Sequence, residues 1–211
     1  MRLLGVSDLH SSTHNLSVLL KREDFDAILV AGDISNGSME DARNILRILS
    51  DSGVPVFFVP GNMDPRPLLE VHELEGCLNV HGDKSFLKGY SIGGIGGAPI
   101  SPFSTRIEFT EEELWSLLKD LGEVDLLLSH SPPFGTALDR VRSGRNVGSK
   151  SVRKYIEEKK PLLCLCGHIH ESSGIEVLGK TFVLNPGPLS WGKYALVELE
   201  GINVKPHLGT L

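Results

Sequence analysis

The stretch Ala27-Ile28-Leu29-Val30-Ala31-Gly32-Asp33 joins an unbroken apolar run to a glycine and an acidic side chain. A continuous apolar run of this length is typical of a strand in a parallel sheet that is covered on both faces. The same order recurs on either side of it, because Leu3 to Val6 is followed by Asp8, and Val54 to Val59 is followed by Asn62. The repetition predicts three strands of one sheet, each with a polar side chain just beyond its end.

Helical patterns separate these three runs. Asn15 to Leu20 carries leucines at helical spacing, and Met39 to Leu49 carries apolar residues on one helical face. Ser38 supplies a starting cap for the second helix, and Gly53 supplies a stop. The order strand, helix, strand, helix, strand implies parallel pairing with right-handed crossovers.

The rest of the chain is richer in strands. Thr110 and Glu113 form the pattern of a capping box, which predicts a helix that reaches about Leu121. We expect a further helix at 151–159, strands at 78–80, 86–87, 90–95, 124–129 and 162–166, and hairpin strands at 175–178, 181–184, 194–199 and 202–205. The fold class is therefore α/β.

Composition restricts the class of protein. The chain has 211 residues, a net charge of −6 and a pI of about 5.7, with 40% hydrophobic and 23% charged residues. These values exclude disordered and collagen-like chains and argue against a protein that wraps long nucleic acid. Three cysteines cannot all pair, and no apolar stretch is long enough for a secretion signal or a membrane span. We expect a single domain over residues 1–211, in the cytoplasm and away from membranes.

Side chains that can bind metals follow the predicted strands. They are two aspartates, one asparagine and four histidines: Asp8, His10, Asp33, Asn62, His130, His168 and His170. In an open α/β sheet, ligands bind outside the carboxyl ends of the strands. If the strands are parallel, all seven side chains converge on one edge, where they form a candidate metal centre.

The chemistry of these seven groups favours a particular class of cation. Mixed oxygen and imidazole ligands suit Mn²⁺, Fe, Zn²⁺, Co²⁺ or Ni²⁺ better than Mg²⁺ or Ca²⁺. The ligand types do not choose among these metals, and Mn²⁺ is the one that we expect. Seven ligands exceed what one ion takes, whereas two ions that share Asp33 would use them all. Two ions about 3.5–4 Å apart can hold a hydroxide between them and clamp a phosphoryl group.

Five short blocks resemble the signature motifs of the calcineurin-like metallophosphoesterases. The blocks are Asp8-x-His10, Gly32-Asp33, Gly61-Asn62, Ser129-His130 and Gly167-His168-x-His170, in the order of the family. Asn185-Pro186-Gly187-Pro188 is similar to the loop that often follows the last block. The resemblance covers nearly the whole chain and implies a four-layer α/β/β/α sandwich, with two mixed sheets face to face and helices outside.

The resemblance also implies which residues hold each ion. The first ion would be bound by Asp8, His10, Asp33 and His170. The second would be bound by Asp33, Asn62, His130 and His168.

One position departs from the family pattern. The block reads Gly61-Asn62-Met63-Asp64, where family members commonly carry a histidine after the asparagine. That histidine helps to protonate the leaving group, and a methionine cannot donate a proton. Members with an apolar residue at this place resemble phosphodiesterases that prefer good leaving groups. Asp64 either orients the ligand shell or a neighbouring histidine, or caps a helix after Pro65.

The resulting mechanistic hypothesis is an in-line displacement on a small or nucleotide-like phosphodiester. A metal-bridging hydroxide attacks phosphorus, and Asp33, Asn62 and His130 hold the ions that neutralise the phosphoryl charge. Residues 135–160 carry eight basic against three acidic side chains, within a chain that is acidic overall. Arg142 and Arg145 could contact the non-reacting part of the ester, while a solvated loop and helix face is the alternative reading.

Two alternative functions remain at this stage. One is a nuclease of the same family, although the negative charge and the absence of an obvious second domain make nucleic acid an unfavourable partner. The other is a metal-containing binding module that has lost turnover together with its acid. A homodimer is a family-level expectation only.

Gly174 to Thr181 also matches the spacing of a phosphate-binding P-loop. Such a loop needs a strand before it and a helix after it. Apolar residues on both sides of Gly179-Lys180 instead predict a hairpin that turns there.

Overall fold

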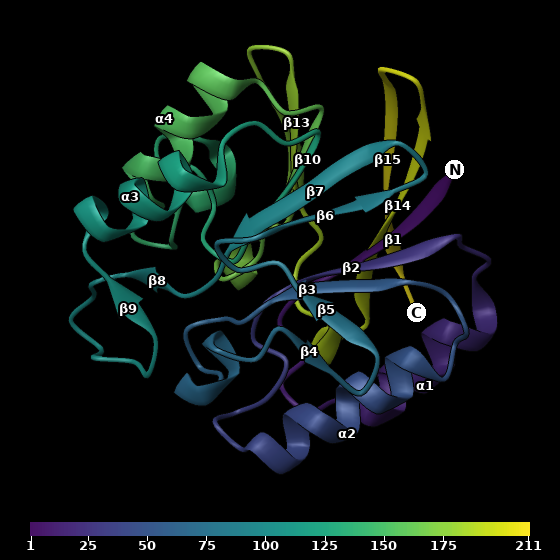
Figure 1. Cartoon of the computed structure of the whole chain (residues 1–211). Helices are drawn as coiled ribbons and strands as arrows, with labels where there is room; N and C mark the ends of the chain where they lie inside the picture. The colour runs from purple at the N-terminus through teal and green to yellow at the C-terminus, as the bar shows by residue number, and fades with distance from the viewer.

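The structure, a computed structural model, describes all 211 residues and places two β-sheets face to face between helices (Figure 1). The strands of the first sheet are β1 (Arg2–Val6), β2 (Ala27–Ala31), β3 (Val56–Val59), β4 (Glu73–Leu74), β5 (Cys77–Asn79), β14 (Lys193–Glu200) and β15 (Asn203–Thr210). Their order across the sheet is β15-β14-β1-β2-β3-β5-β4.

The second sheet has six strands. They are β6 (Lys84–Leu87), β7 (Tyr90–Ile95), β10 (Leu126–Ser129), β11 (Leu163–Leu165), β12 (Gly174–Leu178) and β13 (Thr181–Asn185), in the order β12-β13-β11-β10-β7-β6. A separate short pair is formed by β8 (Ala98–Pro99) and β9 (Glu108–Phe109).

Four α-helices and four 3₁₀ turns complete the chain. The α-helices are α1 (Thr13–Arg22), α2 (Met39–Ser50), α3 (Glu111–Leu121) and α4 (Lys150–Lys159). The 3₁₀ turns are Arg66–Leu69, Ala137–Asp139, His170–Ser172 and Leu189–Trp191.

The central strands of both sheets run parallel. β1, β2 and β3 pair in parallel, as the sequence predicts, with Leu4 opposite Ile28 and Ile28 opposite Val56. In the second sheet β10 pairs in parallel with both β7 and β11. Antiparallel strands extend both sheets, so each sheet is mixed.

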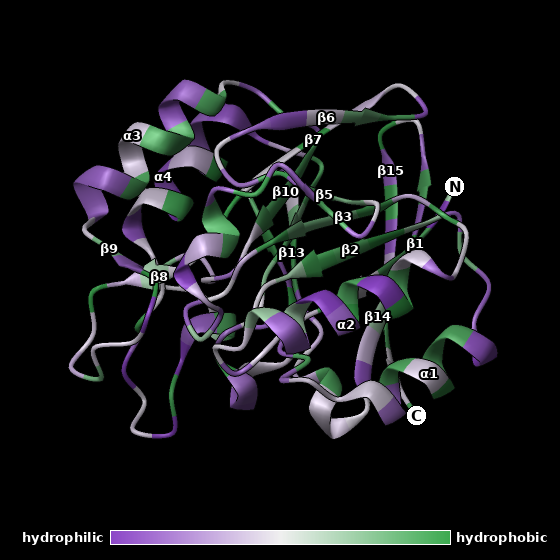
Figure 2. Cartoon of the chain, turned by 60° about the horizontal axis from the view of Figure 1, so that its bottom comes forward, coloured by the Kyte–Doolittle hydropathy of each residue, from purple (hydrophilic) through white to green (hydrophobic).

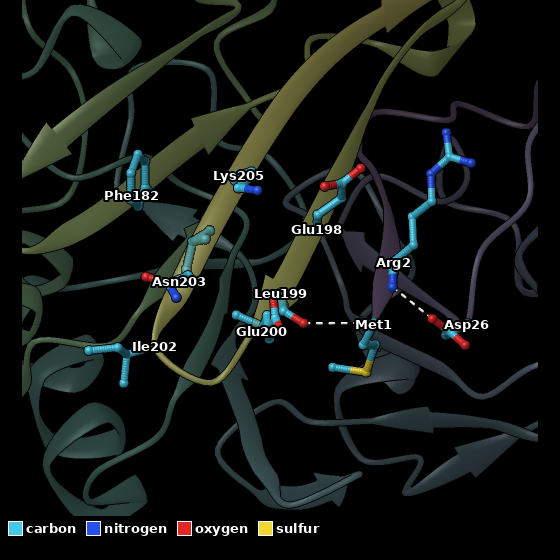
Figure 3. A pocket seen from close by; sticks show the side chains of 11 residues that line it. Met1, Arg2, Asp26, Phe182, Glu198, Leu199, Glu200, Ile202, Asn203 and Lys205 are labelled. Carbon is cyan, nitrogen blue, oxygen red and sulfur yellow. Dashed lines mark hydrogen bonds between the residues drawn. The ribbon is translucent and has the colours of Figure 1, made fainter.

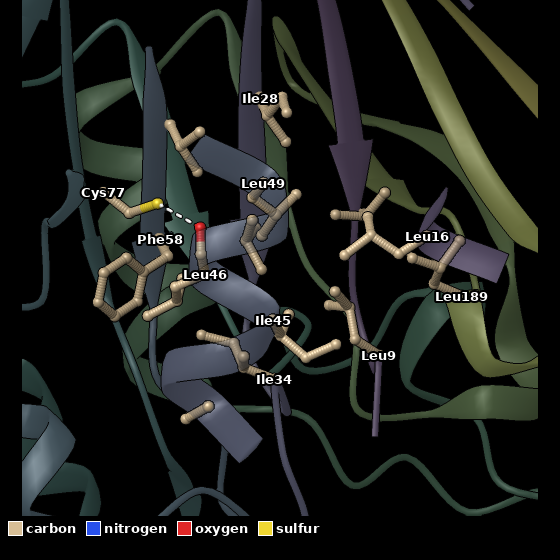
Figure 4. Packing of buried hydrophobic residues seen from close by; sticks show 14 of the residues in the cluster. Leu9, Leu16, Ile28, Ile34, Ile45, Leu46, Leu49, Phe58, Cys77 and Leu189 are labelled. Carbon is tan, nitrogen blue, oxygen red and sulfur yellow. Dashed lines mark hydrogen bonds between the residues drawn. The ribbon is translucent and has the colours of Figure 1, made fainter. Parts of the chain in front are cut away.

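Alternate residues of the central strands face different layers. Leu4, Val6 and Ile28 pack with α1 and α2 in the apolar cluster that Figure 4 shows in part. Their neighbours Leu3 and Leu29 pack against the second sheet. Because both faces are covered, the strands are almost wholly apolar, as Figure 2 shows for β2 and β3.

The outer face of the second sheet is covered by α3 and α4. Leu127, Cys164 and Val183 pack there with Leu118 and Tyr155 from the two helices. Cys164 is fully buried, and burial raises the pKa of its thiol to about 12, so it packs as a small apolar side chain. The resulting four layers confirm the expected α/β/β/α sandwich.

Local signals act as the sequence predicts. The Ser38 hydroxyl accepts a hydrogen bond from the Asp41 N–H at the start of α2. Thr110 and Glu113 form both hydrogen bonds of the capping box at the start of α3. β12 and β13 pair antiparallel around Gly179-Lys180, which excludes a P-loop there. None of the helices has the length and apolar character that crossing a bilayer requires.

Candidate metal centre

The seven candidate ligands gather where the two sheets meet at the carboxyl ends of their parallel strands. Asp8, Asp33 and Asn62 lie beyond the ends of β1, β2 and β3. His130 comes directly after β10, and His168 lies just past the end of β11. The ring of His130 reaches across to the first sheet, where its Nδ1 lies 2.8 Å from the carbonyl oxygen of Ala31.

One group of ligands contains Asp8, His10 and His170. Their ligand atoms all lie within 4.8 Å of one another. His170 Nε2 lies 3.2 Å from Asp8 Oδ1 and 3.4 Å from His10 Nε2. Asp8 is fully buried, whereas the two histidines are partly open to solvent, so the centre is reached from their side.

A second group contains Asp8, Asp33 and His130, all of them buried. His130 Nε2 lies 3.6 Å from Asp33 Oδ1 and 2.8 Å from Asn62 Oδ1. The rings of His168 and His130 lie edge to face, with centroids 5.0 Å apart. The structure therefore brings together all seven side chains that the sequence singles out.

The orientation of two histidines shows that the site fits a cation. His130 uses Nδ1 to contact the Ala31 carbonyl oxygen, and His10 uses Nδ1 to contact Asn36 Oδ1 at 2.9 Å. Because both partners are acceptors, each Nδ1 carries a proton, and Nε2 is the ring nitrogen that each histidine turns toward the centre. The lone pair of His130 Nε2 faces another acceptor, Asn62 Oδ1, and a shared metal ion would satisfy both.

The charges of the centre support the same conclusion. Burial raises the pKa of Asp33 well above its ordinary value, and the negative charges of Asp8 and Asp64 add to this rise. Burial also opposes the ionisation of Asp8, but hydrogen bonding to His170 and the charge of His130 lower its pKa to about 2. Burial lowers the pKa of His130. Carboxyl groups and imidazoles buried this close together form a donor set that a divalent cation stabilises.

The ligand loops have an unusual backbone. Asp8, His10, Asp33 and His168 have φ values of 52°, 45°, 50° and 68°. Residues other than glycine rarely adopt positive φ values, because each such backbone conformation costs about 1–3 kcal/mol. Residues with this conformation cluster at functional sites. Loop-to-loop hydrogen bonds hold them, since Asp8 N donates to Gly32 O and His10 N donates to Asp33 O.

Two glycines allow the loops to approach one another. A Cβ atom on Gly32 would collide with the ring of His130, and its φ of +85° also disfavours other residues. A Cβ atom on Gly61 would collide with Asp33. The glycines before Asp33 and Asn62 are therefore required by the packing of the ligands themselves.

Asp64 is fully buried beneath these loops. Its carboxylate accepts hydrogen bonds from the N–H groups of Ile34, Ser35 and Gly61, at 3.0, 2.7 and 2.8 Å, and from the Ser35 hydroxyl at 3.1 Å. Burial raises the pKa of Asp64, and the backbone donors act against this rise. The prediction that Asp64 caps a helix is wrong, because the 3₁₀ turn Arg66–Leu69 begins after Pro65 and has no side-chain cap. Asp64 instead ties the loop of Asp33 to the loop of Asn62.

The two arginines proposed as substrate contacts lie on an exposed loop between the 3₁₀ turn Ala137–Asp139 and α4. The N–H of Arg142 donates to the carboxylate of Glu171, which follows His170 in the chain. The carbonyl of Arg145 accepts a hydrogen bond from Val141 N. The loop is thus attached next to a candidate ligand, and both side chains are exposed.

Three neighbours of the centre were not singled out from the sequence. Asn36 contacts His10, the Trp191 ring lies edge to face with His170 at 5.5 Å between centroids, and Arg106 Nη1 donates to Met63 O at 3.4 Å. No short-range motif marks any of them. Arg106 and Trp191 reach the centre from loops distant in sequence, whereas Asn36 lies three residues past Asp33 and contacts a histidine from another loop.

A hollow of the surface lies elsewhere on the molecule. It has a volume of about 790 Å³ and is lined by the β14–β15 turn, the start of β1 and Phe182 (Figure 3). It lies beside Met1 and Arg2, at the opposite end of β1 from Asp8. The Met1 amino group donates a hydrogen bond to the Leu199 carbonyl, and the Arg2 N–H donates one to the Asp26 carboxylate. The hollow is therefore separate from the candidate metal centre.

Known proteins resemble this chain over most of its length. The uncharacterized protein MJ1162 of Methanocaldococcus jannaschii is 37% identical over 205 residues, which cover 92% of this chain and 91% of that protein. A Fibrobacter succinogenes protein named "Probable cyclic nucleotide phosphodiesterase" is 28% identical over 173 residues, which cover 78% of this chain and 65% of that protein. The crystal structure of TT1561 of Thermus thermophilus has a TM-score of 0.71 and 25% identity, covering 98% of this chain and 97% of that one.

Residues 33–208 match the family described as metallophosphoesterase, calcineurin superfamily. This match spans most of the chain, including five of the seven candidate ligands that follow the strands. The chain belongs to the metallophosphoesterases of the calcineurin superfamily, a family of phosphoester hydrolases that use divalent metal ions.

Proposed function

We propose that this metallophosphoesterase is a phosphodiesterase with a two-ion centre, and that its substrate is a small or nucleotide-like phosphodiester. The observation that carries the proposal is the position of the Asp33 carboxylate. Its Oδ2 lies 3.8 Å from His10 Nε2, and its Oδ1 lies 3.6 Å from His130 Nε2. A carboxylate that turns one oxygen toward each ligand group is suited to bridge two ions.

The chain's own residues prepare this centre for a phosphate ester. Two divalent ions, when bound, activate a water molecule and neutralise charge on the phosphoryl oxygens. Asp33, Asn62 and His130 would hold them, and the Ala31 carbonyl fixes the ring of His130. Arg142 and Arg145 would contact the non-reacting part of the ester from their exposed loop.

The preference for diesters is argued from Met63. A thioether next to Asn62 cannot protonate a leaving oxygen, which favours esters whose leaving group departs readily. The similarity to the Fibrobacter protein named "Probable cyclic nucleotide phosphodiesterase" supports the same class. Mn²⁺ is the first metal to test, followed by Fe²⁺, Zn²⁺, Co²⁺ and Ni²⁺, because the ligands are oxygen and imidazole.

The deciding experiment compares a chromogenic phosphodiester with the matching monoester. The protein is stripped of metal, reloaded with each ion in turn, and assayed beside Asp33→Asn. We expect metal-dependent hydrolysis of the diester, weak hydrolysis of the monoester, and a loss of about 100-fold or more in kcat/KM for Asp33→Asn.

Other results would contradict parts of the proposal. Strong hydrolysis of the monoester would show that the substrate class is wrong. Full metal content without hydrolysis of either ester would support the binding-module alternative. Preferred hydrolysis of nucleic acid, with affinity falling steeply as salt rises, would support the nuclease alternative.

A further inference from the structure

Met63 leaves the position after Asn62 without a proton donor or a positive charge. Its side chain is half-buried, and its backbone carbonyl faces Arg106, whose Nη1 donates a hydrogen bond to it at 3.4 Å. The guanidinium group of Arg106 therefore lies beside the place where the usual histidine is missing.

The backbone of Arg106 is fixed to the ligand loop. The N–H groups of Arg106 and Ile107 both donate to the carbonyl of Asn62, at 3.1 and 3.2 Å. Arg106 directly precedes Ile107 and β9, in the loop that joins the β8–β9 pair (Figure 1). The backbone from which the Arg106 side chain extends is thus fixed in position next to Asn62. Precise recognition of a substrate requires side chains that are fixed in this way.

The side chain also reaches the loop that follows Asp33. A Cβ atom on Gly37 would collide with the guanidinium group of Arg106, so the group lies directly against that glycine. Arg106 consequently spans the two loops that carry Asp33 and Asn62.

The charge of Arg106 has no partner within the protein. Arg106 takes part in none of the ion pairs of the chain, and its side chain is exposed. The nearby carboxylate of Glu108 is already occupied, because it accepts hydrogen bonds from Ser101 and Thr105 at 2.7–3.3 Å. By contrast, Arg43 and Arg47 both pair with Glu75. Most of the five donors of Arg106 remain free for a ligand.

We propose that Arg106 binds the phosphoryl group of the substrate on its leaving-group side and supplies there a fixed positive charge in place of the missing histidine. The proposal rests on the proposed phosphodiesterase function. A guanidinium group suits phosphate oxygens because its planar fork can bind two of them at once. It also stays protonated at any ordinary pH, so it stabilises charge without giving up a proton.

The consequence for the reaction is specific. The bond from water oxygen to phosphorus forms, the bond from phosphorus to the leaving oxygen breaks, and its electron pair stays on the leaving oxygen. The proton of the attacking water passes to solvent. Arg106 keeps all its protons, and the leaving oxygen departs as an anion that takes its proton from solvent. Removing Arg106 should therefore harm esters with poor leaving groups most.

The test uses Arg106→Gln and Arg106→Lys in the Mn²⁺-loaded protein, with Arg66→Gln as a control. Arg66 is also exposed and has no ion pair, but it lies on the 3₁₀ turn past Pro65. The first measurement is calorimetric binding of inorganic phosphate. The second is kcat/KM for a series of aryl phosphodiesters whose leaving phenols differ in pKa.

We expect Arg106→Gln to weaken phosphate binding about tenfold and to lower kcat/KM about 100-fold for the least acidic phenol, with a smaller loss for nitrophenol. Arg106→Lys should recover part of both effects, and Arg66→Gln should stay within twofold of the unmodified protein. Metal content and the thermal midpoint should be unchanged in all variants, since the side chain is exposed.

Contrary results separate the two proposals. Equal losses for every leaving group with unchanged phosphate affinity would reduce Arg106 to a structural role. Unchanged kinetics and phosphate affinity in Arg106→Gln would overturn the proposal and leave the phosphodiesterase function intact. If the unmodified protein hydrolyses no diester, the proposed function fails, and phosphate affinity then decides whether Arg106 binds the phosphoryl group.

Discussion

Asp64 illustrates how a residue without access to substrate can control the centre. Its four hydrogen bonds all lead to the loops of Asp33 and Asn62, and solvent does not reach it. Carboxylates that orient ligand loops in this way tune metal affinity through the ligands. We therefore interpret Asp64 as a positioning residue.

Replacement of this carboxylate should weaken metal binding. In Asp64→Asn one acceptor oxygen becomes an NH₂ group, which faces backbone N–H donors and cannot accept their hydrogen bonds. We expect metal affinity to fall about 10–100-fold and stability to fall by about 1–3 kcal/mol. Metal titration and urea unfolding measure the two effects, with the exposed Asp51→Asn as a control. A fall in kcat at unchanged metal affinity would instead indicate a direct role on substrate.

His81 provides a residue-scale prediction about pH. Its Nδ1 accepts a hydrogen bond from Gly96 N at 2.8 Å, and its ring stacks on Phe109. Burial lowers the pKa of His81 to about 4, below the ordinary value of 6.5. Between these two values the unfolded chain binds more protons than the folded one, so stability is complete above pH 6.5 and is lost as pH falls toward 4.

The variant His81→Asn should remove this part of the pH dependence. Asparagine keeps an acceptor oxygen for Gly96 N but does not titrate. Urea unfolding at pH 7 and pH 4.5 should show the unmodified protein losing up to about 3 kcal/mol more than the variant. Equal losses in the two proteins would show that His81 stays neutral in both states or charges in both.

At the scale of elements, a single carboxylate joins the two helices that cover the second sheet. Glu111, in the first turn of α3, accepts hydrogen bonds from Lys150 N and Ser151 N at 2.9 and 2.8 Å, and from the Ser149 hydroxyl at 3.0 Å. Burial would raise the pKa of Glu111, but these hydrogen bonds outweigh it and lower the pKa below 4.5. The negative charge thus lies at the N-terminus of α4, where a helix favours it.

Glu111→Gln should therefore destabilise the protein by about 1–2 kcal/mol at pH 7. A group with a lowered pKa contributes its stability above the unfolded value and loses it as pH falls through the folded value. The difference from the unmodified protein should accordingly shrink below pH 4.5. Glu112→Gln, one residue along and exposed, is the control in urea unfolding. A difference that does not shrink as pH falls below 4.5 would contradict the role of the charge.

The elements that the sequence predicts are those with strong local patterns. The run at 27–31 and the caps at Ser38 and Thr110 depend only on neighbours in the chain, and the structure has them as predicted. The sequence does not reveal that β14 pairs antiparallel with β1, while β12 and β13 join the other sheet. A hairpin pattern identifies two strands that pair with each other, but it does not identify the sheet that they join.

The same reasoning explains which site residues were found. The candidate ligands follow strand ends, so the topology of a parallel sheet is enough to bring them together. Arg106 and Trp191 approach from loops whose course depends on tertiary packing, and no spacing in the chain marks them. Their positions become visible only once the β8–β9 pair and the turn Leu189–Trp191 are placed.

At the scale of the whole molecule, the candidate metal centre connects the two sheets. Asp8, Asp33 and Asn62 come from the first sheet, and His130 and His170 come from the second. Ions bound there would link the strand ends of both sheets. Because a ligand that binds only the folded state stabilises it, metal should raise the resistance of the entire fold to heat.

Removal of metal should therefore lower the thermal midpoint. With free metal at about 1,000 times its Kd, one ion contributes about 4 kcal/mol, which is about 8–16 °C for a chain of this size. Calorimetry before and after treatment with a chelator measures the shift, and Asp33→Asn should reduce it. An unchanged midpoint in the unmodified protein would mean that the ligand cluster binds metal too weakly to connect the sheets.

The contact between Trp191 and His170 gives the protein a spectroscopic property. Only two tryptophans are present, and the other, Trp115, packs under Lys154 on the outer helices. Indole emission is sensitive to paramagnetic ions and to the charge of an adjacent imidazole, so occupancy of the first ligand group should change the light emitted by Trp191 alone. The emission of Trp191 can thus follow the loading of one half of the centre in real time, without any added dye.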